Sequence, residues 1–210
     1  MEKVTCLEVG RVRNIPKLQT VMRATQKRYN RFFGKRLNMP IIIMPTSRRQ
    51  IDQITGRKSA AWSVGWISPG VIYILSPEKY TVESSHNQKS DFWKTLVHEY
   101  AHIYIRNIGG YNVPRWLNEG LACWLAKQPK SKPTIDEAFE VLIPYKAYSS
   151  LVYKVGTFWV KRLIEKYGQK KIATLISLMG EKMDRDVFKV AFRKTYGLTW
   201  KKATLKKLYK

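Results

Sequence analysis

The stretch His98-Glu99-Tyr100-Ala101-His102 is the feature that most constrains how this chain can fold. Histidines four residues apart lie one turn apart on the same face of an α-helix, so both imidazoles can reach one metal ion. Glu99 is rotated about 100° from His98 around the helix axis. It would therefore lie beside the ion, where it can act as a base and not as a ligand. The stretch requires a helix around it and a third ligand elsewhere.

Helix signals flank the histidine pair on both sides. Ser90 or Asp91 is expected to cap a helix that runs to about Asn107, and Gly109-Gly110 is expected to end it. The apolar residues that give this helix a buried side are Phe92, Leu96, Val97 and Ile103. HExxH on a helix is the signature of zinc proteases, in which the glutamate is the general base.

A catalytic zinc keeps three protein ligands and an open position for water. His86 precedes the motif in a polar stretch, and we interpret it as an ordinary exposed histidine. The best candidate for the third ligand is Glu119, on a second helix predicted from Pro114 to about Lys127. The glycine pair between the two helices would let the second fold back, so that the carboxylate could reach the imidazoles.

The two motifs together resemble a known family. HExxH followed at short distance by Pro114-Arg115-Trp116-Leu117-Asn118-Glu119-Gly120-Leu121-Ala122 is similar to the gluzincin metallopeptidases, specifically the peptidase-MA-like group. The segment Tyr153 to Val160 is similar to the family's Y-x-x-G-x-x-F-V helix. The resemblance covers residues 60 to 200, in which the two metal motifs are specific and the remainder is weak.

The resemblance implies a zinc-dependent metalloendopeptidase that hydrolyses peptide bonds with a water activated at the zinc. His98, His102 and Glu119 are then the zinc ligands, and Glu99 is the general base and acid. Tyr153 is implied as an oxyanion donor, although a helical tyrosine is as commonly a packing residue. Gly156, one turn later, would let another backbone or a substrate approach closely.

One position departs from the family pattern. Many gluzincins carry an acidic residue four positions after the third ligand, where this chain has Cys123. The thiol could lie beside the metal ligands, could bind a stray metal, or could be a buried small hydrophobe, and the last interpretation is favoured. Asn118 is an alternative residue for orienting Glu119.

The predicted architecture is α+β. The resemblance implies a zincin-like fold, with a small mixed sheet and the motif helix in an N-terminal lobe, 1–128, and a mostly helical C-terminal lobe, 129–210, within one compact catalytic domain. Before the boundary we predict helices over 17–33 and 48–54, the second capped by Ser47, a strand over 41–44 and a hairpin within 61–75. After it we predict helices over 148–167, 170–179, 184–196 and from 199. The resemblance also implies an edge strand, expected at 71–75, that pairs with an extended peptide substrate.

The chain has a formal net charge of +24, and no acidic residue occurs between Glu8 and Asp52. Such a field favours nucleic acid, ribosomes or anionic membrane as partners, although a solvated basic face is an equal alternative. A second functional hypothesis is therefore a nucleic-acid-associated protein with a structural or vestigial zinc site. A protease delivered to nucleic-acid-bound proteins and a latent protease whose basic C-terminal segment fills the cleft are further alternatives.

The sequence shows neither a signal peptide nor a transmembrane segment, so a cytoplasmic location is expected. Cys6 and Cys123 do not form a disulfide framework and suit a reducing compartment. The oligomeric state is not predicted.

Overall fold

The computed structural model describes residues 6–8, 11–12, 15–86, 88–111, 113–142, 150–180 and 186–209. It confirms a mixed α+β class, mostly helical with a small sheet. The chain divides into two compact units, Met1–Arg31 with Lys35–Ile103 and Phe32–Gly34 with Tyr104–Lys210. The division into catalytic lobes at residue 129 stays a prediction.

The first unit is built on a sheet with strand order β2-β1-β3-β5-β4. The strands are β1 (Cys6–Glu8), β2 (Arg11–Val12), β3 (Ile41–Met44), β4 (Gly65–Ser68) and β5 (Val71–Ile74). The pairs β1–β3 and β3–β5 are parallel, whereas β2 and β4 pair antiparallel at the two ends. The predicted hairpin is confirmed as β4 and β5, while the predicted strand at 41–44 is β3.

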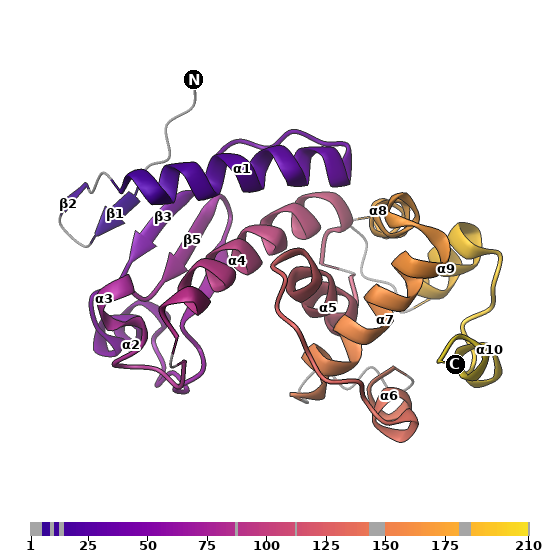
Figure 1. Cartoon of the computed structure of the whole chain (residues 1–210). Coiled ribbons are helices and arrows are strands. Elements are labelled where there is room, and N and C mark those ends of the chain that lie inside the picture. Colours follow the sequence, from indigo (N-terminus) through magenta and orange to yellow (C-terminus); the bar gives the residue numbers. More distant parts are fainter. Residues whose placement is uncertain are drawn as a thin grey trace. The chain divides into compact units, whose positions relative to one another are not determined.

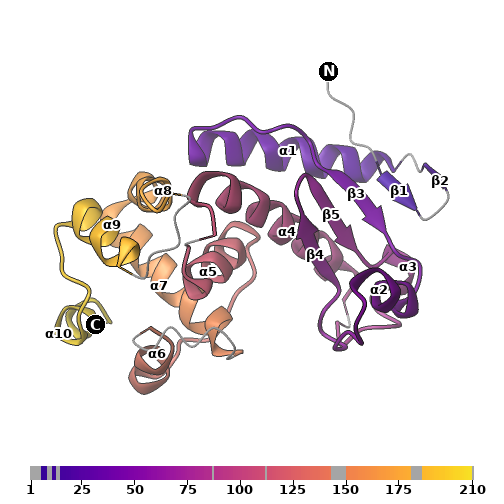
Figure 2. The same cartoon turned by 180° about the vertical axis from the view of Figure 1, so that it is seen from behind.

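The edge strand was wrongly predicted. The strand expected at the edge, β5, lies inside the sheet because its second side pairs with β3. Ile72 and Ile74 of β5 are fully buried, as is typical of an interior strand. Among the described strands β4 is the one that ends the sheet on this side, and Figure 2 shows it there. The partner of a strand is fixed by non-local pairing, which the local pattern of residues 71–75 does not contain.

Two long helices cover one face of this sheet. Figures 1 and 2 show α1 (Pro16–Phe33) and α4 (Lys89–Gly109) on the same side of the strands within the first unit. Ile42 of β3 and Ile72 and Ile74 of β5 are completely buried. The short helices α2 (Arg48–Thr55) and α3 (Pro77–Tyr80) complete the unit. Ser47 caps α2 as predicted, by accepting a hydrogen bond from the Gln50 amide.

The motif helix α4 begins at Lys89, before both of the expected cap residues. Ser90 and Asp91 therefore lie in its first turn and not at the cap position. Near its middle the helix is buried on several sides, since Leu96, Tyr100 and Ala101 are wholly inaccessible. In this region the Tyr29 hydroxyl donates a 3.0 Å hydrogen bond to the Val97 carbonyl. The motif thus lies on a long helix whose middle turns are firmly packed.

The second unit consists of helices. They are α5 (Arg115–Leu125), α6 (Ile135–Leu142), α7 (Leu151–Tyr167), α8 (Gln169–Ser177), α9 (Val187–Tyr196) and α10 (Lys202–Tyr209), with the ends of α1 and α4. Residues 148–149 and 184–185 of the predicted helices lie outside the described residues. Sequence analysis did not single out α6, although Thr134 and Glu137 form a capping box there, with each side chain accepting from the other's amide.

The helices α5 and α7 pack backbone to backbone. A Cβ atom on Gly120 would lie 2.2 Å from the Gly156 carbonyl carbon, and one on Gly156 would lie 1.9 Å from the Trp116 carbonyl oxygen. Only glycine fits at either position. The expected close approach at Gly156 is therefore that of another helix backbone.

Among the helices in the described parts of the chain, none is both long enough and apolar enough to cross a membrane.

Candidate metal centre

The motif helix brings its two imidazoles together. The Nε2 atoms of His98 and His102 lie 3.0 Å apart, and the ring planes are nearly perpendicular, at 84°. Two nitrogens bound to one tetrahedral zinc at the usual bond length are separated by about 3.3 Å. The imidazoles therefore already converge on one point, as the spacing of four residues predicts.

Glu119 completes this group. One ligand atom each from His98, His102 and Glu119 lie within 4.8 Å of one another, and the three residues could hold a metal ion. The Glu119 side chain is only 13% exposed, and an Arg115 guanidinium nitrogen lies 3.9 Å from its carboxylate. Two imidazoles and one carboxylate match the protein donor set of a catalytic zinc. The residues present thus fit the expected ion.

Glu99 lies beside this group with its carboxylate against the sheet. A Cβ atom placed on Gly65 would lie 3.1 Å from Cγ and 3.2 Å from Oε1 of Glu99. Gly65 is the first residue of the edge strand β4, so the carboxylate lies where that strand begins. Glu99 is 8% exposed and His98 is 7% exposed. Glu99 is thus a buried carboxylate that adjoins His98 in sequence and is not one of the three residues grouped for a metal ion.

A tyrosine anchors the turn of α4 that precedes Glu99. The Tyr80 hydroxyl is 2.6 Å from Thr95 Oγ1, and both residues are buried. Burial raises the pKa of Tyr80 to about 12, and the nearby carboxylates of Asp91 and Glu99 add to the rise. Tyr80 is therefore a neutral hydrogen-bonding group across the physiological range.

Arg48 braces the loop that leads into β4, and sequence analysis missed this role. Its guanidinium donates to the carbonyls of Ala60 and Ala61 at 2.8 and 3.0 Å, and to the Glu83 carbonyl at 2.6 Å. Its backbone amide also donates to the Glu83 carboxylate. Arginine meets several carbonyls at once because its donors form a rigid fork. No sequence motif marks such a contact.

The structure also describes the surroundings of the four other residues that the sequence analysis considered. Cys123 is completely buried on α5, one turn after Glu119, which agrees with a small hydrophobic residue. Tyr153 is half-buried on α7, where its carbonyl accepts from the Thr157 hydroxyl and Lys130 lies 5.9 Å from its ring centroid. Asn118 is half-buried next to Glu119. His86 packs its ring 5.1 Å from Tyr80 and is not part of the three-residue group.

No protein-family model matches this sequence. The search of curated proteins likewise finds no match. The resemblance to gluzincins therefore rests on the two motifs and on the residues that they bring together.

Proposed function

We propose that this chain is a zinc-dependent metallopeptidase of the gluzincin type with a zincin-like fold. The observation that carries the proposal is the convergence of His98, His102 and Glu119 within 4.8 Å. Two of the three histidines in the chain fall in this one group. A buried Glu99 beside the ligands favours a catalytic over a structural site, because a structural zinc needs no base.

A bound zinc would polarise the peptide carbonyl and acidify a water molecule. His98 and His102 supply neutral imidazole ligands from one helical face, and Glu119 supplies the carboxylate that fixes the third position. Glu99 accepts the proton of the attacking water and returns it to the leaving amine. Its burial against Gly65 limits the side chain to few rotamers, which holds the carboxylate in place for both transfers.

The edge strand β4 is the surface on which we place the substrate. It pairs with β5 on one side, and its other side carries backbone groups that an extended peptide can meet. Because β4 begins at Gly65, a peptide added to this strand would run past the Glu99 carboxylate. Main-chain pairing would give affinity with little selectivity for side chains.

Tyr153 is proposed as the oxyanion donor. Within the second unit it lies on α7, three residues before Gly156, where α7 touches the backbone of α5. This contact resists sliding of α7 against α5, the helix that carries Glu119. It therefore fixes the position of Tyr153 relative to the third ligand. A fixed donor stabilises developing charge without reorganising during the reaction.

Cleavage of a peptide library by zinc-loaded protein tests the proposal. Glu99→Gln should abolish turnover and keep the metal, since it removes the base and none of the ligands. Glu78→Gln, the same change at an exposed position, is the matched control and should cleave at the wild-type rate. Wild-type turnover by Glu99→Gln would refute the role of Glu99.

A further inference from the structure

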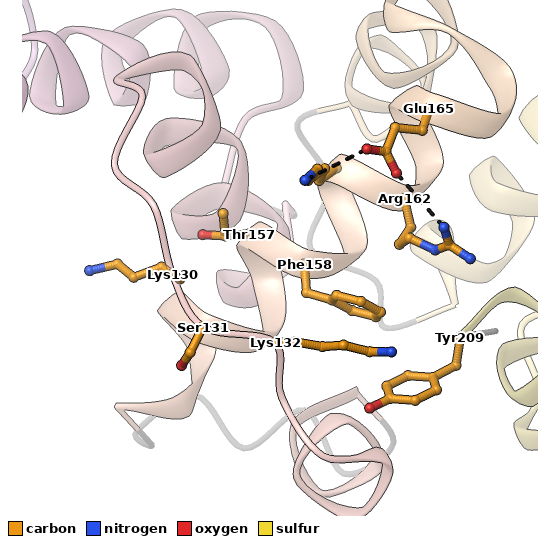
Figure 3. Close-up of a pocket in the computed structure, with 9 residues that line it drawn as sticks. Lys130, Ser131, Lys132, Thr157, Phe158, Arg162, Glu165 and Tyr209 are labelled. Carbon is orange, nitrogen blue, oxygen red and sulfur yellow. Dashed lines mark ion pairs between the residues drawn. The ribbon is translucent and has the colours of Figure 1, made fainter.

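Two adjoining hollows run along α7 in the second unit. The larger, with a volume of about 400 Å³, is lined by the segment Lys130 to Lys132, by α7 and by Tyr209 of α10. The smaller, of about 320 Å³, lies between α7 and the Lys207–Leu208 part of α10. Both are lined by Arg162 and Glu165, so they lie next to each other on one stretch of the α7 surface. We refer to the two hollows together as the α7–α10 groove, and Figure 3 shows its larger part.

The groove is strongly cationic. The basic side chains that line it are Lys130, Lys132, Lys161, Arg162, Lys166 and Lys207. Among its described lining residues Glu165 is the only acidic one. Glu165 lies 3.7 Å from Lys161 and 3.8 Å from Arg162, which are loose ion pairs with exposed side chains. The cations therefore remain largely unneutralised around a concave surface, where like charges repel unless an anion is bound.

Aromatic rings lie among these cations. Phe158 and Tyr209 pack with their centroids 5.2 Å apart, and the Lys132 ammonium is 4.7 Å from the Tyr209 centroid. In Figure 3 the Lys132 side chain extends beside Phe158 towards Tyr209. The Tyr209 hydroxyl donates a 2.6 Å hydrogen bond to the Pro133 carbonyl, which fixes this ring at the rim of the hollow. Both rings are half-buried and keep some accessible surface.

We propose that the α7–α10 groove binds single-stranded nucleic acid. Its cations would contact successive backbone phosphates, and a base would stack on the Tyr209–Phe158 pair. Cationic grooves with aromatic platforms are the common means of binding single strands. Two consecutive hollows that share Arg162 fit an extended polyanion better than a compact one. The net charge of +24 supports a polyanionic partner, and the groove is the surface to which that partner would bind.

The test is fluorescence anisotropy with a labelled 20-nucleotide oligothymidylate over a range of salt concentrations. The groove variant Lys132→Gln/Lys161→Gln/Lys207→Gln removes three charges from the groove. Its control, Lys170→Gln/Lys194→Gln/Lys201→Gln, removes three exposed charges of the same unit outside the groove. We expect the groove variant to bind about tenfold more weakly or worse, with a salt slope lower by about 2, because each phosphate contact on a single strand contributes about 0.7. The control variant should weaken binding by less than about fivefold, which is half the loss expected for the groove variant.

The ring contribution is tested separately. Tyr209→Leu should weaken binding at least about fivefold, whereas Tyr209→Phe, which keeps the ring and loses only the hydrogen bond to Pro133, should weaken it much less. Circular dichroism and thermal melting confirm that each variant is folded.

Four results would overturn the proposal. The groove and control variants could lose affinity equally, which would indicate diffuse attraction. Tripolyphosphate could displace the oligonucleotide at equal phosphate concentration, which would indicate a small-anion site. Tyr209→Leu and Tyr209→Phe could bind alike, or a duplex of the same length could bind more tightly, and either result would exclude a single-strand platform. Glu99→Gln should bind like the wild type, so this proposal stands or fails independently of the peptidase function.

Discussion

Substituting Gly156 by alanine tests whether the α5–α7 crossing holds the third metal ligand in place. The new Cβ would lie 1.9 Å from the Trp116 carbonyl oxygen and 3.0 Å from Gly120 Cα, so the two helix backbones must move apart. Overpacking of this kind costs about 1–3 kcal/mol and sometimes more. The gain in helix propensity from glycine to alanine offsets about 1 kcal/mol of that cost. Because the clash is with backbone atoms, we expect a cost at the upper end and a net destabilisation of about 2 kcal/mol.

Urea unfolding monitored by circular dichroism measures this effect. A loss of about 2 kcal/mol corresponds to a fall in Tm of about 4–8 °C for a chain of this size. Glu119 lies on α5 next to Gly120, so the separation of the two helices should also weaken zinc binding.

Gly197→Ala is the control, since its positive φ of 70° strains an alanine but nothing lies within 4 Å of the new Cβ. It should cost about 1–2 kcal/mol and leave zinc affinity unchanged. Wild-type stability of Gly156→Ala would refute the close crossing.

Three further predictions concern the first unit. Gly65→Ala should displace the Glu99 carboxylate and lower kcat about tenfold or more at unchanged zinc content, and wild-type kcat would contradict this positioning. Arg48→Lys loses several carbonyl contacts and should lower the free energy of unfolding by about 2 kcal/mol, measured in urea, whereas Arg49→Lys, an exposed neighbour, should not. Hydrogen bonds from Ser59 lower the pKa of Asp52 below its ordinary 3.8, so its stabilising contribution is fully present above pH 3.8 and is lost as the pH falls from there through the lowered pKa of the folded state. The difference in urea midpoint between wild type and Asp52→Asn should therefore shrink below pH 3.8, and a constant difference would contradict this origin.

Turn residues, cap residues and residue spacing predicted those elements whose conformation depends on neighbours in the sequence. The β4–β5 hairpin follows from β-forming residues on both sides of Ser68-Pro69-Gly70, and α2 follows from its Ser47 cap and from Gly56 in a left-handed conformation. The histidine spacing likewise predicted that His98 and His102 share one helical face. The same kind of signal could have revealed α6, because its capping box is legible in the sequence.

Non-local pairing accounts for what the sequence analysis missed. The strands β1 and β2 are only three and two residues long, and β1 is a strand because it pairs with β3, more than 30 residues away. For the same reason β5 was mistaken for the edge strand. Gly156 predicted a close approach, but its partner, the backbone of α5, depends on how two helices pack. The contacts of Arg48 with loop carbonyls have no periodicity or motif at all.

The zinc content of purified protein after dialysis tests the central claim most directly. Elemental analysis should find one zinc per chain in the wild type and in Glu99→Gln, which keeps all three ligands. His102→Ala and Glu119→Ala should each lose most of it, while retaining the helical circular dichroism of the wild type. A folded wild-type protein that binds no stoichiometric zinc, or a Glu119→Ala variant that holds zinc as tightly as the wild type, would contradict the proposed site.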